Sequence, residues 1–204
     1  RTLKKQVLKL PHIKAKRKRY LEYIRSSYDY TQKPPTILCS TCIGGMIAHN
    51  LGLQFMSPTI NLWLTSSDLV KFVSDLNKYL TAEIQFVQTI QYDYPVGKLG
   101  DITIYFQHYT NNQEAEEKWN DRKKRIDLEN LYIITDDKRL TDDEMNRLLS
   151  VPCKRLIVFT CQPKNDPHFF RLECYAGSVE IGRYSVRDLH GFAPFEREFN
   201  YAAW

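Results

Sequence analysis

The sequence predicts an α/β fold, with three layers (α/β/α), a largely parallel sheet and an antiparallel hairpin as its C-terminal extension. Short apolar runs of strand length, such as Leu131 to Thr135 and Arg155 to Thr160, alternate with segments of helical periodicity over most of the chain. Such alternation is typical of a sheet covered by helices on both faces. After Thr160 the helical period ends. Phe169 to Tyr175 and Val179 to Tyr184 then predict a hairpin around a turn that contains Gly177.

The length and composition predict one domain over residues 31–204, preceded by a basic, helical segment over residues 1–30. The chain has 204 residues, of which 43% are hydrophobic, and this is enough for a core. Five cysteines at irregular spacing predict reduced thiols and a cytoplasmic setting. No apolar run approaches the 18 residues that a membrane span needs. Because the chain opens at Arg1 rather than Met, we expect a segment to precede it.

The positive charge belongs to the first 25 residues. They hold ten Lys or Arg and a single acid, Glu22, whereas the rest of the chain has more acids than bases. The run from Lys14 to Ile24 predicts a basic amphipathic helix that rests on anionic lipid at the membrane periphery. A solvated helix face is the plain alternative. Nucleic acid is not expected as a partner, because no docking motif accompanies the run.

The stretch from Thr36 to Pro58 reads as a buried strand, a polar turn and a helix that begins near Cys42 and ends at Gly52. A helix N-terminus lowers the pKa of a thiol, so Cys42 is the predicted nucleophile. Three alternatives remain: a C-S-T-C redox pair with Cys39, a zinc site, and a buried structural cysteine. No second close pair of cysteines supports zinc, so no metal is expected.

The middle of the chain supplies a candidate base. Ser57 to Leu64 alternates as a strand with Asn61 facing away from the aliphatic side chains. A helix follows, and then two strands, Ala82 to Gln91 and Asp101 to His108. His108 therefore lies at the carboxyl end of a strand, where α/β sheets bind ligands, although a structural histidine is the alternative.

The next elements carry further charged candidates. A helix that opens at Asn111 or Asn112 is acidic in its first turn and ends in basic residues that include Arg122 and Arg125. The strand Leu131 to Thr135 is followed at once by Asp136, which either occupies a polar turn or faces the same edge as Cys42 and His108. Thr141 and Glu144 have the spacing of a capping box.

Several motifs together resemble a known group. They are T-C-I-G-G at 41–45, L-G-L at 51–53 with S-P-T at 57–59, Y-P-V-G-K-L-G-D-I at 94–102, F-Q-H-Y at 106–109 and E-A-E-E-K-W-N-D-R-K-K-R at 114–125. The chain resembles, over roughly residues 36–137, the bacterial domains of unknown function grouped as exopolysaccharide or capsular polysaccharide biosynthesis proteins. The resemblance implies an α/β fold and a cytoplasmic role near surface-polysaccharide assembly, with no established reaction. Thr41 stands where many members have Asn, which places a side-chain oxyanion donor at that position in doubt.

The leading hypothesis is a cysteine-dependent acyl transferase or hydrolase that acts on a glycan or glycan precursor without a cofactor. Cys42 is the nucleophile and His108 the general base and acid, a pairing similar to that of papain-like hydrolases. Asp101, Asp136 or Asn61 orients the imidazole. Backbone N–H groups near Ile43 and Gly44 hold the oxyanion. The predicted substrate-binding residues are Thr41, Ile43, Gly44, Gly45, Tyr109, Arg122 and Arg125.

Two other function classes stay open. In the first, the helix N-terminus holds a phosphate of an activated sugar, with Arg122 and Arg125 as its partners, and the protein is a sugar or phosphosugar transferase. In the second, the protein is a scaffold or glycan-binding subunit that docks through its basic head. The separation of Cys42 and His108 discriminates the classes, because only the enzyme needs the two side chains within hydrogen-bond reach.

Overall fold

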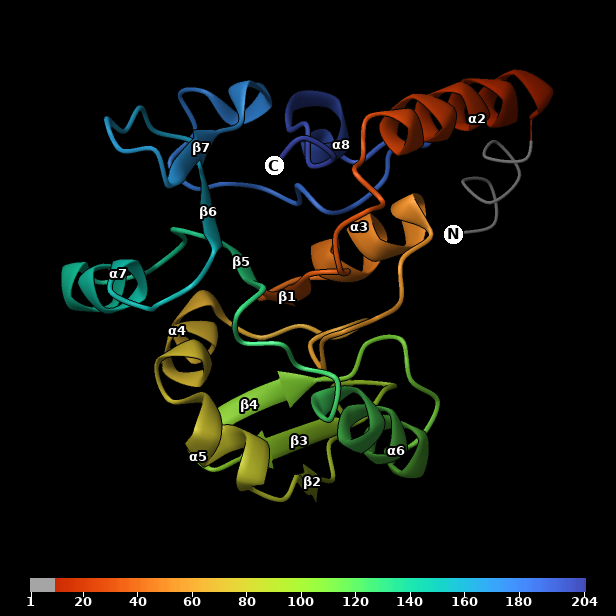
Figure 1. Cartoon of the computed structure of the whole chain (residues 1–204). Helices are drawn as coiled ribbons and strands as arrows, with labels where there is room; N and C mark the ends of the chain where they lie inside the picture. Colours follow the sequence, from red (N-terminus) through yellow and green to blue (C-terminus); the bar gives the residue numbers. More distant parts are fainter. Residues whose placement is uncertain (1–9) are drawn as a thin grey trace.

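The computed structural model describes residues 10–204 (Figure 1). Residues 1–9, which belong to the predicted basic segment, lie outside the described residues. Within the described part of the chain, no helix is long and apolar enough to cross a membrane.

A four-stranded parallel sheet forms the centre of the fold. Its strands are β1 (Thr36–Cys39), β5 (Leu131–Asp136), β6 (Arg155–Thr160) and β7 (Phe169–Arg171), in the spatial order β1-β5-β6-β7. All four residues of β1 and all six of β5 are buried, which explains why these strands read as unbroken apolar runs. The predicted α/β class and the largely parallel sheet are confirmed.

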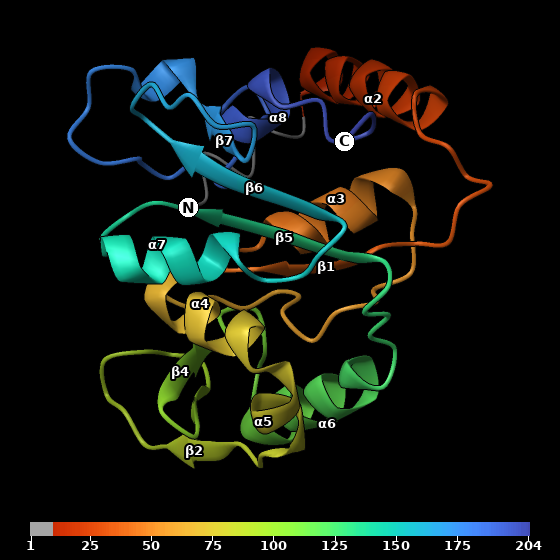
Figure 2. The same ribbon diagram turned by 60° about the vertical axis from the view of Figure 1, so that its left-hand side comes forward.

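Helices cover both faces of this sheet (Figures 1 and 2). The helices on one face are α2 (Pro11–Ser26), α3 (Ile43–Leu51) and α8 (Pro194–Glu198); α4 (Ser66–Ser74) and α7 (Asp142–Leu149) lie on the other. Strand β1 shows the division, because Ile37 and Cys39 point into the core beneath α3 whereas Leu38 points into the core beneath α4. The Thr141–Glu144 capping box opens α7 as predicted.

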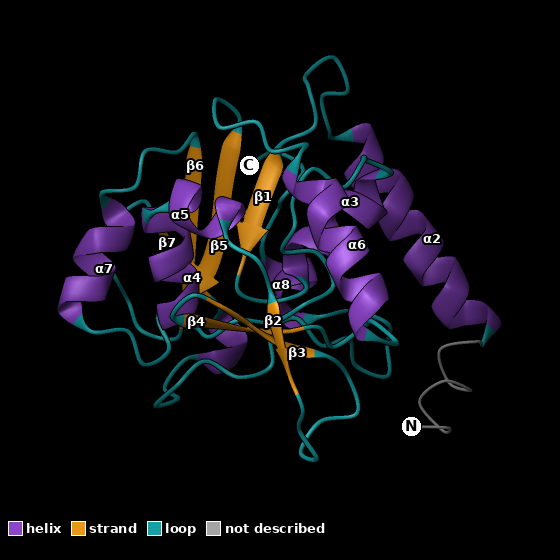
Figure 3. Ribbon diagram, turned by 90° about the horizontal axis from the view of Figure 1, so that it is seen from below, coloured by secondary structure: helices purple, strands orange, loops and turns teal. Residues whose placement is uncertain are grey.

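A second, antiparallel sheet packs below the first. It consists of β2 (Gln85–Val87), β3 (Val96–Leu99) and β4 (Ile102–Tyr105), in that spatial order, with α5 (Leu76–Thr81) and α6 (Asn112–Lys123) beside it (Figure 3). Ile102 and Ile104 are fully buried in the same core as Leu38. The antiparallel strands therefore lie in the middle of the chain, and the two sheets share one apolar core.

The antiparallel hairpin predicted for the C-terminal part does not form. Phe169–Arg171 is the parallel edge strand β7, a 3₁₀ turn, η1 (Glu173–Tyr175), follows it, and residues 179–184 form no strand. Ile181 and Tyr184 are 2% and 3% exposed. They fill the core between the sheet and α8 as single side chains, so their alternation reflects burial without strand pairing.

The strand predicted over Ser57 to Leu64 does not form either. Side chains compete for its backbone: Ser57 Oγ accepts the Thr59 N–H at 3.1 Å, and Asn61 has a φ of 61°. Only Trp63 pairs, in an antiparallel bridge with Tyr105. The segment instead connects the two sheets.

Candidate functional site

The start of α3 positions Cys42. β1 ends at Cys39, and Cys42 occupies the N-cap position of α3 three residues later. The turn is tight because a Cβ on Gly44 would lie 2.5 Å from Cys39 Sγ, so only glycine lets α3 pack this closely on β1. Cys42 is half-buried, at the carboxyl edge of the parallel sheet.

Residues 63 and 64 bring His108 to the same edge. The Leu64 N–H donates to the Ser40 carbonyl at 2.9 Å, just beyond β1. Trp63 exchanges two backbone hydrogen bonds of 2.9 Å with Tyr105, the last residue of β4. The ends of β1 and β4 are thereby tied together, and His108 follows β4 by three residues. Cys42 Sγ and His108 Nε2 lie 3.4 Å apart.

The electrostatics of Cys42 differ from the prediction. Desolvation by burial raises the pKa of the Cys42 thiol to about 11, whereas the sequence predicted a lowered pKa at a helix N-terminus. At neutral pH the group is therefore a protonated thiol rather than a preformed thiolate. A base must remove its proton as it reacts, and His108 is in place to accept it.

The predicted orienting role of Asp101 is wrong. Asp101 precedes β4, whereas His108 follows it, so the two lie beyond opposite ends of the strand. Lys78 Nζ at 2.8 Å and the Tyr79 hydroxyl at 2.9 Å donate to Asp101 Oδ1. These donors hold the pKa of Asp101 well below its usual range. Asp101 is a surface ion-pair residue.

Asn61 and Asp136 do not orient the imidazole either. Asn61 Oδ1 lies 3.2 Å from the position that a Cβ on Gly45 would take, against the first turn of α3. Asp136 reaches the cleft described below, but its carboxylate accepts from Ser66 Oγ and the Tyr184 hydroxyl, each at 2.7 Å. Among residues 10–204, Cys42 is the single hydrogen-bonding partner of the His108 side chain. The site is a dyad.

The predicted oxyanion donors change as well. The Gly44 N–H donates to Cys39 Sγ at 3.1 Å in the core, so it points away from any substrate. The Ile43 side chain is fully buried beneath α3, which leaves its backbone N–H as the part of the prediction that the structure does not contradict. Gly44 and Gly45 serve close packing.

Tyr109, Arg122 and Arg125 hold the loop after α3 rather than a substrate. The Tyr109 hydroxyl donates to the Ile60 carbonyl at 2.7 Å, and Arg122 Nη1 donates to the Tyr109 hydroxyl and, at 3.3 Å, to the Ile60 carbonyl. Arg125 Nη1 donates to the Phe55 carbonyl at 3.2 Å and its guanidinium pairs with Asp121. None of the three residues lines the cleft beside Cys42 that is described below. Their basic and aromatic side chains turn inward because loop carbonyls need donors.

A cleft of about 710 Å³ opens beside Cys42. Its lining includes Thr41, Cys42 and Asp136, which the sequence predicted, together with Tyr184. One wall is aromatic: Trp63 packs on Tyr105 with ring centroids 4.4 Å apart, Tyr92 packs on Tyr105 at 5.3 Å, and Tyr92 stacks on Tyr94 at 5.1 Å.

The lining of the cleft also includes basic residues. Lys138 and Arg139 line it and share Glu180 at 2.9 and 3.2 Å. Arg183 lines it too, and its exposed side chain forms no ion pair with any residue of the described range 10–204. Sequence reasoning missed Arg183 because no predicted strand of the sheet ends just before it, and it missed Lys138 and Arg139 because only Asp136 was considered after the strand Leu131 to Thr135. The sequence feature that could have indicated the cleft is the pair of tyrosines at 92 and 94, together with Arg183 next to Tyr184.

No group of three or more His, Cys, Asp or Glu side chains within residues 10–204 is arranged to hold a metal ion. Cys161 and Cys174 lie in the C-terminal part of the chain, and all five cysteines are free thiols. The donors near Cys42 are thus one thiol, one imidazole and one carboxylate that is occupied by other partners.

Comparison with known proteins identifies relatives. The profile of a family described as "Domain of unknown function (DUF1919)" matches residues 13–204. A Haemophilus influenzae protein that carries the name "Uncharacterized protein" is 39% identical over 134 residues, which make up 65% of this chain and 65% of that protein. The chain thus covers slightly less than two thirds of that relative. The resemblance seen in the sequence holds at the level of a domain of unknown function.

Proposed function

We propose a function for this chain, which belongs to the DUF1919 family of domains of unknown function. It is a cysteine-dependent acyl transferase or hydrolase that acts on a glycan or glycan precursor during surface-polysaccharide assembly. The observation that carries the proposal is the 3.4 Å separation of Cys42 Sγ and His108 Nε2, since Cys42 also lines the cleft. A scaffold would not need a thiol and an imidazole at this distance.

The proposed reaction has two steps. Cys42 Sγ attacks the acyl carbon of the donor while the thiol proton passes to His108 Nε2, and the tetrahedral intermediate collapses to a thioester. His108 returns the proton to the departing oxygen of the donor. In the second step His108 takes a proton from a sugar hydroxyl or from water, and that oxygen displaces Cys42 from the thioester. The acyl group is transferred, the thiol is regenerated, and no redox partner is needed.

The aromatic wall supports a sugar as the bound molecule. Tyr92 and Tyr94 are half-buried, so their rings are fixed by packing while part of each surface stays open. Aromatic faces of this kind pack against the apolar faces of sugar rings, and tyrosine hydroxyls bind sugar hydroxyls. The proposal also includes a cytoplasmic location, because free thiols at Cys39 and Cys42 persist in a reducing compartment.

The basic side of the cleft favours a second candidate, a sugar or phosphosugar transferase. Lys138, Arg139 and Arg183 place three cations in the lining of the same cleft, and these suit a phosphate or another anionic group. In this alternative Cys42 and His108 take no part in covalent chemistry, so trapping of an acyl-enzyme separates the two candidates.

The test is capture of an acyl-enzyme. The protein is mixed with p-nitrophenyl acetate at neutral pH, quenched in acid and analysed by peptide mass mapping. We expect an acetyl thioester on Cys42 in the native protein, none in Cys42→Ser, and about a hundredfold slower acetylation in His108→Ala. Cys174→Ser is the matched control, because Cys174 is exposed and lies outside the cleft.

Two results would contradict the acyl-transfer proposal. Acetylation that falls on Cys174 rather than Cys42 would show that exposure alone decides reactivity. Equal acetylation of Cys42 in the native protein and in His108→Ala would remove His108 from the mechanism. Either result leaves the sugar transferase or a non-catalytic glycan-binding subunit as the better description.

A further inference from the structure

We infer that the outer face of α2 is a docking surface for anionic lipid headgroups at a membrane surface. The inference does not depend on the chemistry of Cys42. It rests on three observations: the division of charge along the chain, the fixed attachment of α2 through its inner face, and the basic and apolar composition of what α2 leaves exposed.

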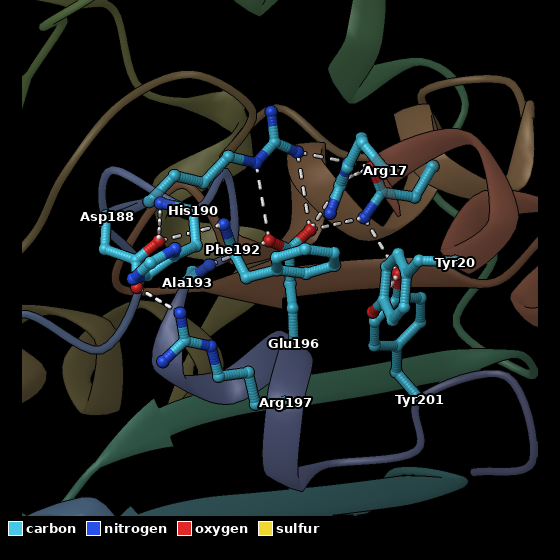
Figure 4. A network of polar contacts seen from close by, with 11 residues as sticks. Arg17, Tyr20, Asp188, His190, Phe192, Ala193, Glu196, Arg197 and Tyr201 are labelled. Carbon is cyan, nitrogen blue, oxygen red and sulfur yellow. Dashed lines mark hydrogen bonds and ion pairs between the residues drawn. The ribbon is translucent and has the colours of Figure 1, made fainter. Parts of the chain in front are cut away.

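The side chains on the inner face of α2 contact other parts of the domain. Ile13 and Ile24 are buried, and the Tyr20 hydroxyl donates to the Tyr201 hydroxyl at 2.9 Å. Arg17 Nη2 pairs with Glu196 Oε1 at 2.7 Å, and the side chain of Glu196 is completely buried. Figure 4 shows Arg17 and Tyr20 of α2 meeting Glu196 and Tyr201 of the C-terminal segment. The helix is therefore a fixed part of the domain and presents one defined face outward.

Basic side chains occupy the exposed flanks of α2. Lys14 and Arg19 are exposed and form no ion pair with a residue in the described range 10–204. Lys18 is 79% exposed. Its contact with Glu22, the single acid of this helix, is long at 3.8 Å. Arg17 pairs with Glu196, Arg25 donates to the Asn50 carbonyl, and Lys16 lies over the Phe192 ring. The patch is defined here as the other three exposed cations of the helix, Lys14, Lys18 and Arg19.

Apolar surface adjoins this patch, which favours lipid over a purely electrostatic partner. A cavity of about 460 Å³ runs along the flank of α2, and its lining includes the partly buried Leu21 together with Lys14 and Lys18. On the other flank Tyr23 is 60% exposed, and Leu10 before the helix is 42% exposed. A helix with cations and scattered apolar side chains on its open side is typical of interfacial binding to anionic bilayers.

The rest of the chain makes the attachment directional. Helix α2 carries six Lys or Arg against one Glu, whereas residues 27–204 hold more acids than bases. An anionic surface therefore attracts the α2 side of the molecule, which lies opposite α6 (Figure 1). Lys118 and Lys123 of α6, with Lys124 at its C-cap, are basic residues on that side, and they serve as a control for charge without this setting.

The experiment is flotation of the full chain with vesicles of phosphatidylcholine alone or with phosphatidylglycerol added. The test variant combines Lys14→Glu, Lys18→Glu and Arg19→Glu; the matched control combines Lys118→Glu, Lys123→Glu and Lys124→Glu, with the same change in net charge. We expect recovery with the anionic vesicles only, a loss of about tenfold or more in partitioning for the α2 variant, and a much smaller loss for the α6 variant. Circular dichroism melting verifies that both variants fold.

Several outcomes would overturn the inference. Equal recovery from neutral and anionic vesicles, or no recovery from either at low ionic strength, would do so. An equal loss in the two variants would show that net charge rather than the patch decides binding. Binding of the native protein to duplex DNA but not to anionic vesicles, abolished by the α2 variant, would assign the same patch to nucleic acid.

Discussion

The Gly44 N–H donates a hydrogen bond to Cys39 Sγ at 3.1 Å, in a place where a Cβ on Gly44 would approach the same sulfur to 2.5 Å. The relationship divides the two cysteines of C-S-T-C between different roles. Cys39 is fully buried, and its burial raises the pKa of its thiol to about 12, so it is a packing residue. Cys42 is left as the thiol of the pair that faces the cleft.

Gly44→Ala is expected to destabilise the protein by about 2 kcal/mol or more, because the new methyl group overlaps Cys39 Sγ and the neighbouring Ile37. The measurement is urea unfolding. In a Cys39→Ala background the same change should cost clearly less, since the sulfur is gone. Gly45→Ala is the control, because its nearest neighbours lie 3.2 Å away and need to move only slightly. Equal costs with and without Cys39 would contradict this packing account.

His108→Ala is expected to slow the reaction of Cys42 with iodoacetamide at pH 7.5 by about tenfold or more, because burial keeps the pKa of the thiol near 11 and a base must assist. Above pH 11 the two proteins should react alike, since the thiolate then forms without help. His108 is exposed, so the free energy of unfolding should change by less than about 0.5 kcal/mol. His49→Ala, at an exposed position on α3, is the matched control. A large stability loss with an unchanged pH profile would make His108 structural.

Glu196 is expected to make the protein acid-sensitive. Arg17 and a backbone N–H of Ala193 lower the pKa of Glu196 despite the opposing effect of its burial. A carboxylate whose folded pKa is depressed stabilises the fold above its unfolded pKa, near 4.5, and loses that contribution as the pH falls through the folded value. Glu196→Gln should therefore cost about 3 kcal/mol at pH 7, because Arg17 loses its buried partner, and the difference from the native protein should shrink below pH 4.5.

Thermal unfolding of both proteins from pH 3 to pH 7 measures this effect. The control is Glu22→Gln, since Glu22 is 62% exposed and its contact with Lys18 is long. A pH dependence of Glu196→Gln that parallels that of the native protein would show that other carboxylates govern acid unfolding.

Tyr184→Phe is expected to cost about 1–3 kcal/mol, because the Asp136 carboxylate loses a buried donor at 2.7 Å. Asp136 keeps Ser66 and the Lys138 N–H, so the fold should persist. Tyr23→Phe, at an exposed tyrosine, should change the free energy of unfolding by less than about 0.5 kcal/mol. If the two substitutions cost the same in denaturant titrations, the carboxylate does not depend on Tyr184.

The features that could be predicted from the sequence are those that depend on residues close together in the chain. Strands buried on both faces, such as β5 and β6, read as apolar runs, and the Thr141–Glu144 cap depends on residues three apart. The approach of Cys42 and His108 could be anticipated because each follows a strand end. Tyr184 meets Asp136 across 48 positions, and nothing near either residue signals the pair. Arg122 reads as a surface cation, yet it is 8% exposed because distant loop carbonyls require its donors.

The junction of Arg17 with Glu196 also has a consequence for biosynthesis. The two residues are 179 positions apart, so α2 leaves the ribosome long before its partner exists. Until α8 is made, Arg17 and Tyr20 lack Glu196 and Tyr201, and closing so long a loop is slow. A nascent chain that ends before residue 187 should therefore hold its first helix through earlier elements such as α3, where the Asn50 carbonyl accepts from Arg25 Nε at 2.7 Å, and should be more vulnerable to proteases than the full chain.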